Sequence, residues 1–175
     1  MTQLSLITRP DREVFDATKT YRYELERYFG DGPPALFCGL NPSKAGLKVT
    51  RDNNDPTVRR WIGFAQRWGC GSILIVNAYG FIETKPAVMF RASKRGVDIV
   101  GPENDWYIRA AVSRVKALSG KVCVCWGRNI KSARQAELAY VFGDDAMCLG
   151  VNDDGSPEHA LFIPYERPLE YWRCP

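Results

Sequence analysis

The residues best suited to chemistry in this sequence are two asparagines and the single histidine. Asn41 and Asn77 each follow a short apolar run directly, and His159 lies in a polar turn that contains glycine and proline. An asparagine side chain offers two donors and one acceptor oxygen, so it can orient a water molecule or recognise the edge of a planar base. A histidine can donate to a carbonyl or an oxyanion, or transfer a proton near neutral pH. These residues predict a site for a small planar ligand.

Each of these residues also has a simpler interpretation. Either asparagine can be a turn residue that hydrogen-bonds to its own backbone, and His159 can be a surface or structural residue. The occurrence of two asparagines at equivalent positions, each at the end of an apolar run, favours the site.

The elements that would position these side chains are short buried strands alternating with helices. Continuous apolar runs predict strands at residues 35–40, 72–76, 121–126 and 146–149. Apolar residues at helical spacing predict helices at residues 58–68, 103–118 and 130–142. This alternation predicts one α/β domain over residues 1–175, with three α/β/α layers and a short, mainly parallel central sheet of about four strands.

In a parallel sheet of this kind, ligands bind beyond the carboxyl ends of the strands. That rule selects the loops at residues 41–43, 77–79, 127–129 and 155–159. Residues 1–30 are the hardest to interpret. Their alternating segment at residues 21–29 suits a hairpin arm or an edge extension of the sheet, with a helix as the alternative.

The composition is that of an ordinary globular protein, with 45% hydrophobic and 25% charged residues. The net charge of +4 permits an anionic partner such as nucleic acid without requiring one. No apolar run is long enough to span a bilayer, and the first residues lack the features of a signal peptide. We therefore expect a cytoplasmic protein with no membrane partner, and the oligomeric state stays open.

Several cofactor-binding patterns are missing from the sequence. The six cysteines include no C-x-x-C pair, so we expect reduced, buried thiols and neither a metal nor another cofactor. The signatures of dinucleotide-binding proteins, P-loop NTPases, α/β-hydrolases and zinc deaminases are absent from the sequence as well.

Four short motifs occur in a recognisable order. They are L-N-P-S at residues 40–43, D-P-T at 55–57, G-P-E-N-D at 101–105 and G-x-P-x-H at 155–159. Together they resemble a small bacterial and phage family that is known only as a domain of unknown function, over about residues 21–168.

The motif order also resembles the uracil-DNA glycosylase superfamily, nearest its mismatch-specific branch. Residues 39–43 are similar to the G-I-N-P-G of that branch, whose asparagine positions the attacking water. The resemblance implies that Asn41 and His159 are catalytic. It implies substrate-binding roles for Pro42, Ser43, Thr57, Asn77, Tyr79 and Pro157, and contacts to the DNA backbone for Lys44, Arg60 and Arg128.

The function implied by this resemblance is hydrolysis of the N-glycosidic bond of an unusual, mismatched or modified base in DNA. The alternatives are an enzyme acting on a free nucleoside, nucleotide or related metabolite, and a non-catalytic nucleic-acid-binding module of the same fold. Two departures leave these alternatives open. Ala160 follows His159 where the superfamily has proline, and no aspartate occupies the water-activating position.

Overall fold

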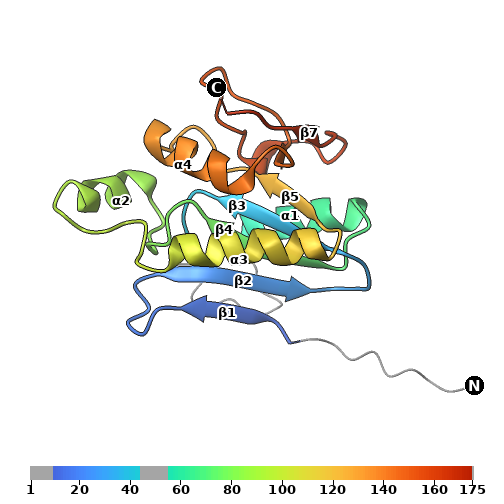
Figure 1. The fold of residues 1–175 in the computed structure, drawn as a ribbon, viewed down its shortest axis with the longest axis horizontal. Helices are drawn as coiled ribbons and strands as arrows, with labels where there is room; N and C mark the ends of the chain where they lie inside the picture. The colour runs from blue at the N-terminus through green and yellow to red at the C-terminus, as the bar shows by residue number, and fades with distance from the viewer. Residues whose placement is uncertain (1–9, 44–54, 175) are drawn as a thin grey trace, which may run out of the picture.

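The chain folds around a seven-stranded mixed sheet in the computed structural model, which describes residues 10–43 and 55–174 (Figure 1). The strand order across the sheet is β1-β2-β4-β3-β5-β6-β7. The strands are β1 Arg12–Phe15, β2 Arg22–Tyr28, β3 Pro34–Gly39, β4 Ser72–Asn77, β5 Lys121–Val124, β6 Met147–Cys148 and β7 Glu170–Tyr171. The helices within the described residues are α1 Pro56–Arg67, α2 Pro86–Ser93, α3 Asn104–Ala117, α4 Ser132–Phe142 and the short 3-10 helix Ala160–Phe162.

The predicted sheet is wrong in size and in direction. Parallel pairing is confined to the central strands β4, β3, β5 and β6, whereas β1 with β2, β2 with β4, and β6 with β7 are antiparallel. The chain therefore does not have the short, mainly parallel, glycosylase-like sheet of about four strands. Strands β6 and β7 have two residues each. The apolar run at residues 146–149 predicted β6, whereas β7 is too short to produce a recognisable pattern in the sequence.

Strand β2 is the largest departure, because it lies inside the sheet between β1 and β4 although four of its seven residues are charged. Three of these charges, Glu24, Glu26 and Arg27, are tolerated because they pair. Glu24 and Glu26 lie beside Arg114 of α3, and the Arg27 guanidinium donates to Glu13 of β1 at 2.7 Å. Charged side chains are buried in proteins almost only when they are paired in this way.

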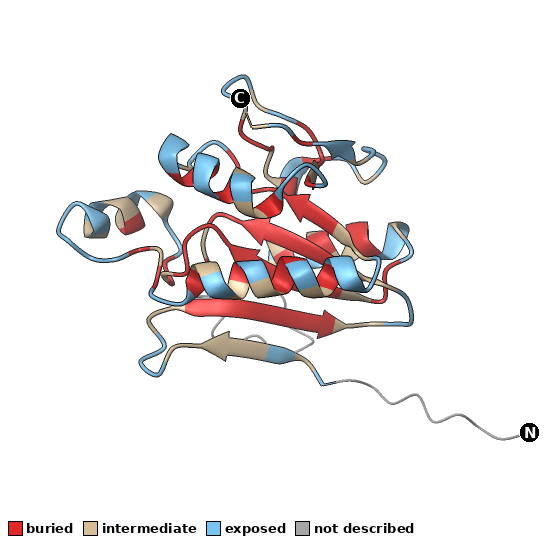
Figure 2. Cartoon of the chain, in the orientation of Figure 1, coloured by how far each residue is buried: buried red, intermediate tan, exposed pale blue. Residues whose placement is uncertain are grey.

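The helices cover both faces of the sheet. Side chains alternate along β3, so that Leu36 packs toward α3 and α4 whereas Phe37 packs toward α1. In Figure 1, α3 crosses in front of the sheet and α1 lies behind it. The strands at the centre are buried and β1 is only partly so (Figure 2).

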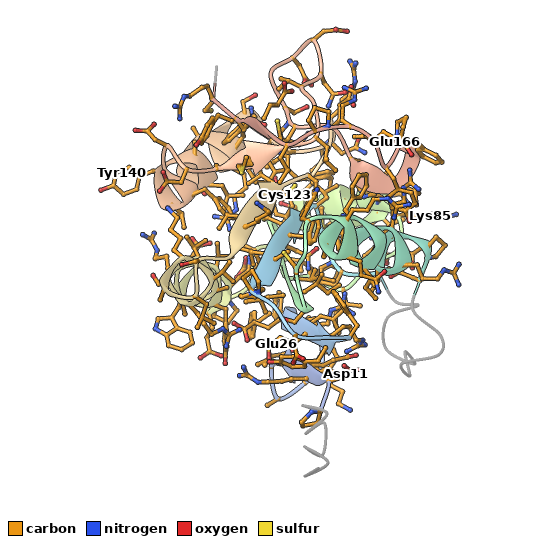
Figure 3. The ribbon with its side chains drawn as sticks, turned by 90° about the vertical axis from the view of Figure 1, so that its right-hand side faces the viewer. Asp11, Glu26, Lys85, Cys123, Tyr140 and Glu166 are labelled. Atoms are coloured by element: carbon orange, nitrogen blue, oxygen red, sulfur yellow. The ribbon has the colours of Figure 1, made fainter. Side chains whose placement is uncertain are left out.

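All six cysteines are free thiols, five of them buried. Cys123 lies in the interior, between the helices that flank the sheet, whereas Tyr140 projects from the surface of α4 (Figure 3). Within the described residues, no helix has both the length and the apolar character needed to cross a membrane.

Candidate functional site

A cavity of about 340 Å³ opens at the carboxyl ends of the parallel strands. The ends of β3 and β4, the loop after β5 and the first turn of α1 contribute to its lining. The start of β2 contributes as well, because an antiparallel strand begins at the edge where its parallel neighbours end. Six of the residues selected from the sequence line this one cavity: Asn41, Ser43, Thr57, Asn77, Arg128 and His159.

The two selected prolines lie beside the cavity and act through their backbone. The carbonyl of Pro42 accepts the Glu83 N–H at 3.0 Å, and the carbonyl of Pro157 accepts the Gly127 N–H at 3.0 Å. These bonds tie the loop after β3 to the loop after β4, and the His159 turn to the end of β5.

Three further candidates are not part of the cavity lining. Tyr79 is buried in the core, with its hydroxyl accepting the Lys131 N–H at 3.2 Å. Arg60 lies over the ring of Tyr165, 3.7 Å from its centroid, and donates to the Ile163 carbonyl. Lys44 lies outside the described residues.

His159 is oriented by the short helix that it begins. The Leu161 N–H donates to His159 Nδ1 at 3.3 Å, so this nitrogen carries a lone pair and the ring proton lies on Nε2. Burial lowers the pKa of His159, and the nearby Asp55 carboxylate opposes this effect. The ring is therefore a neutral N–H donor at the wall of the cavity.

The pKa of His159 can be measured without ambiguity, because it is the only histidine of the chain. We expect nitrogen-detected NMR to show the Nε2–H tautomer and a pKa below the ordinary value of 6.5. In that range the unfolded chain binds more protons than the folded one, so the free energy of unfolding falls as the pH drops below 6.5. His159→Gln removes this contribution. A measured pKa above 6.5 would contradict the assignment.

Asn41 presents an oxygen rather than a nitrogen to a ligand. Its side-chain amide donates to the Pro42 carbonyl at 3.2 Å and to the Glu83 carbonyl. Both N–H groups point at carbonyl oxygens, which fixes the orientation of the amide. The remaining Oδ1 is an acceptor suited to a water molecule.

Asn77 lies at the end of β4 against a glycine of the neighbouring strand. A Cβ atom at Gly39 would lie 3.0 Å from Asn77 Oδ1 and 2.9 Å from Trp61 Cη2. Glycine at this position therefore lets the amide of Asn77 and the ring of Trp61 lie against β3. Trp61 lines the cavity and is the aromatic side chain beside His159, with the two ring centroids 6.5 Å apart.

Sequence reasoning missed three charged residues of the cavity: Arg22, Asp55 and Glu83. Asp55 caps α1 by accepting the Val58 N–H at 3.0 Å. The D-P-T motif at residues 55–57 drew attention to this segment, but an aspartate before a helix is explained by capping alone and does not indicate a site. No pattern in the sequence identified Arg22.

The G-P-E-N-D motif at residues 101–105 lies outside the cavity lining and holds the backbone at the end of β4. Asn104 is fully buried, and its amide donates to the carbonyl of Asn77 at 3.0 Å. Asp105 pairs with Arg134, whose Nε donates to the Ala78 carbonyl at 2.8 Å. These contacts fix the backbone at the end of β4, so the motif positions Asn77 from outside the cavity. Among the described residues, no three His, Cys, Asp or Glu side chains are grouped as metal ligands.

The fold and the site define a mixed α/β protein with a polar, nucleoside-sized cavity at the ends of its central strands. The chain belongs to the family described as "Protein of unknown function (DUF1643)", whose model matches residues 22–161. This segment contains every described residue that lines the cavity. No curated protein and no solved structure matches the chain. Nothing in these comparisons links the family to the uracil-DNA glycosylases.

Proposed function

We propose that this chain hydrolyses the N-glycosidic bond of an unusual, mismatched or modified base at the cavity. The main support is that Asn41, Asn77 and His159, three polar residues far apart in the sequence, line one cavity. Its volume of about 340 Å³ lies in the range that holds small ligands. The resemblance of the motif order to the uracil-DNA glycosylase superfamily is a second, weaker support.

The chemistry follows from what each side chain can donate or accept. When the bond between the sugar carbon and the base nitrogen breaks, the base leaves with negative charge on a carbonyl oxygen. The Nε2–H of His159 would donate to that oxygen and stabilise the charge. Asn41 Oδ1 would hold the attacking water, whose oxygen bonds to the sugar carbon. The water proton would go to the Asp55 carboxylate, which fills the role of the aspartate missing from the motif.

Recognition of the base would use Asn77 and Trp61. The amide of Asn77 can hydrogen-bond to a donor and an acceptor on the edge of a base. Trp61 would offer an aromatic contact to a base that has left its stack.

Two observations bear on whether the substrate is DNA or a free nucleotide. Phe162 lies three residues after His159 and is 89% exposed, so its ring would be available to unstack a base pair in DNA. Of the basic residues expected at the DNA backbone, Arg128 lines the cavity but donates to Asp153, and Arg60 packs on Tyr165. The free nucleoside or nucleotide is therefore the second candidate substrate.

A cytoplasmic location is part of the proposal, supported by six free thiols.

The proposal is tested by a base-release assay with two arms. One arm contains single- and double-stranded oligonucleotides with uracil, mismatched, oxidised and carboxylated bases, and the other contains free nucleosides and nucleoside monophosphates. We expect release in one arm, and a loss of about 10²-fold in kcat in Asn41→Ala, because the water is no longer held beneath the sugar. Gln66→Ala removes an exposed amide of α1 and is the matched control. No release in either arm would contradict the proposal.

A further inference from the structure

Arg22 is a buried cation that forms no ion pair among the described residues. The residue is 4% exposed and lines the cavity. Its Nε has no hydrogen-bond partner, and the guanidinium makes no ion pair with any other residue in the part of the chain that the structure describes. Removing a guanidinium from water is costly unless an anion replaces the lost hydration.

The backbone directs this side chain into the cavity. Val14 of β1 lies opposite Glu24, and the next residue, Phe15, lies opposite Arg22, so Tyr23 is an extra residue in β2. An extra residue reverses the alternation of side chains along a strand, and such bulges often re-aim a side chain beside a functional site. Glu24 accordingly faces Arg114 of α3, whereas Arg22 reaches the opposite face, where α1 borders the cavity.

Each of the other charged residues that line the cavity has contacts of its own, and the Asp55 carboxylate also favours the charged form of Arg22. The Asp55 carboxylate accepts the Val58 N–H, and the Glu83 carboxylate accepts the N–H of Thr84 at 2.8 Å. At the rim, Arg128 donates to Asp153. Arg22 therefore remains as the guanidinium available to a bound ligand.

We propose that Arg22 binds an oxyanion at one end of the ligand, either a phosphate monoester on the sugar or a carboxylate on the base. The planar fork of a guanidinium matches both groups in a bidentate contact. Because Arg22 is only 4% exposed, a ligand must enter the cavity to contact it. The phosphates of a duplex bound at the surface would not reach its guanidinium. The inference rests on the proposed nucleobase site for the identity of the ligand, but it does not require hydrolysis.

The test compares matched neutral and anionic ligands by calorimetry. The pairs are four nucleosides against their 5′-monophosphates, and uracil against its 6-carboxylate. We expect one class of anionic ligand to bind about 10- to 100-fold more tightly than its neutral partner. The class that shows this preference identifies the source of the oxyanion. Arg22→Met and Arg22→Gln should each bind the two members of a pair almost equally.

Two controls separate this result from a general charge effect or from misfolding. Arg109→Gln removes an exposed guanidinium of α3 outside the cavity lining and should keep the preference for the anion. Arg22→Met should melt no lower than the wild type, because an apolar side chain replaces a buried charge that forms no ion pair. Equal binding of both members by the wild type would overturn the inference, as would a preference lost in Arg109→Gln but kept in Arg22→Met. Base release without a preference for anions would leave the proposed function intact, and a preference without release would refute hydrolysis alone.

Discussion

Replacement of His159 by alanine is expected to lower kcat for base release by about 10²- to 10³-fold, the usual cost of losing one donor to a developing oxyanion. The Leu161 N–H holds Nδ1 as an acceptor, so the proton on Nε2 is in place before the base begins to leave. This donor matters most when charge develops on the carbonyl oxygen. KM should therefore change much less than kcat, and single-turnover kinetics on the best substrate of the panel would measure both.

The conservative variant His159→Gln separates hydrogen bonding from structure. A glutamine can donate through its amide, so part of the lost rate should return. The dependence of kcat on the protonation of His159 should disappear in this variant, because glutamine does not titrate. A His159→Ala protein that turns over within a few-fold of the wild type would show that His159 only caps its short helix.

The candidate site was predictable to a large extent because it depends on where strands end. Continuous apolar runs mark β3, β4 and β5, and a polar residue directly after such a run must lie at the carboxyl edge of the sheet. Asn41 and Asn77 were found in this way, and the structure places both at the cavity. The same argument identified His159 through its turn, although no strand of ordinary length precedes it.

The parts that were not predicted depend on contacts between distant segments. The charged residues of β2 indicate an exposed edge until Arg114 and Arg12, from elsewhere in the chain, are placed beside them. The bulge at Tyr23 is a mismatch between two strands, so the alternation of one strand cannot reveal it. Tyr79 was expected at the ligand because it follows Asn77, but the chain turns it into the core.

Trp172, which directly follows strand β7, gives the second large effect. Trp172 lies beyond the segment that the family model matches, and it is 2% exposed. Its ring packs edge-on against Trp126, with the centroids 5.2 Å apart, and its Nε1–H donates to the Gly155 carbonyl at 3.1 Å. Gly155 begins the turn that contains His159. Trp172 therefore supports both the core beneath the cavity and the turn at its wall.

Trp172→Ala is expected to lower the free energy of unfolding by about 3–5 kcal/mol, the usual cost of removing a buried aromatic side chain. Trp172→Phe keeps most of the packing and removes the hydrogen bond to Gly155, which costs about 1 kcal/mol. Because the His159 turn is then less restrained, kcat should fall in Trp172→Phe although the protein stays folded. Tyr171→Ala is the matched control, since this neighbour is 66% exposed and should change stability by less than about 0.5 kcal/mol. Chemical denaturation would measure all three variants. Equal stability of Trp172→Ala and Tyr171→Ala would show that Trp172 does not support the site.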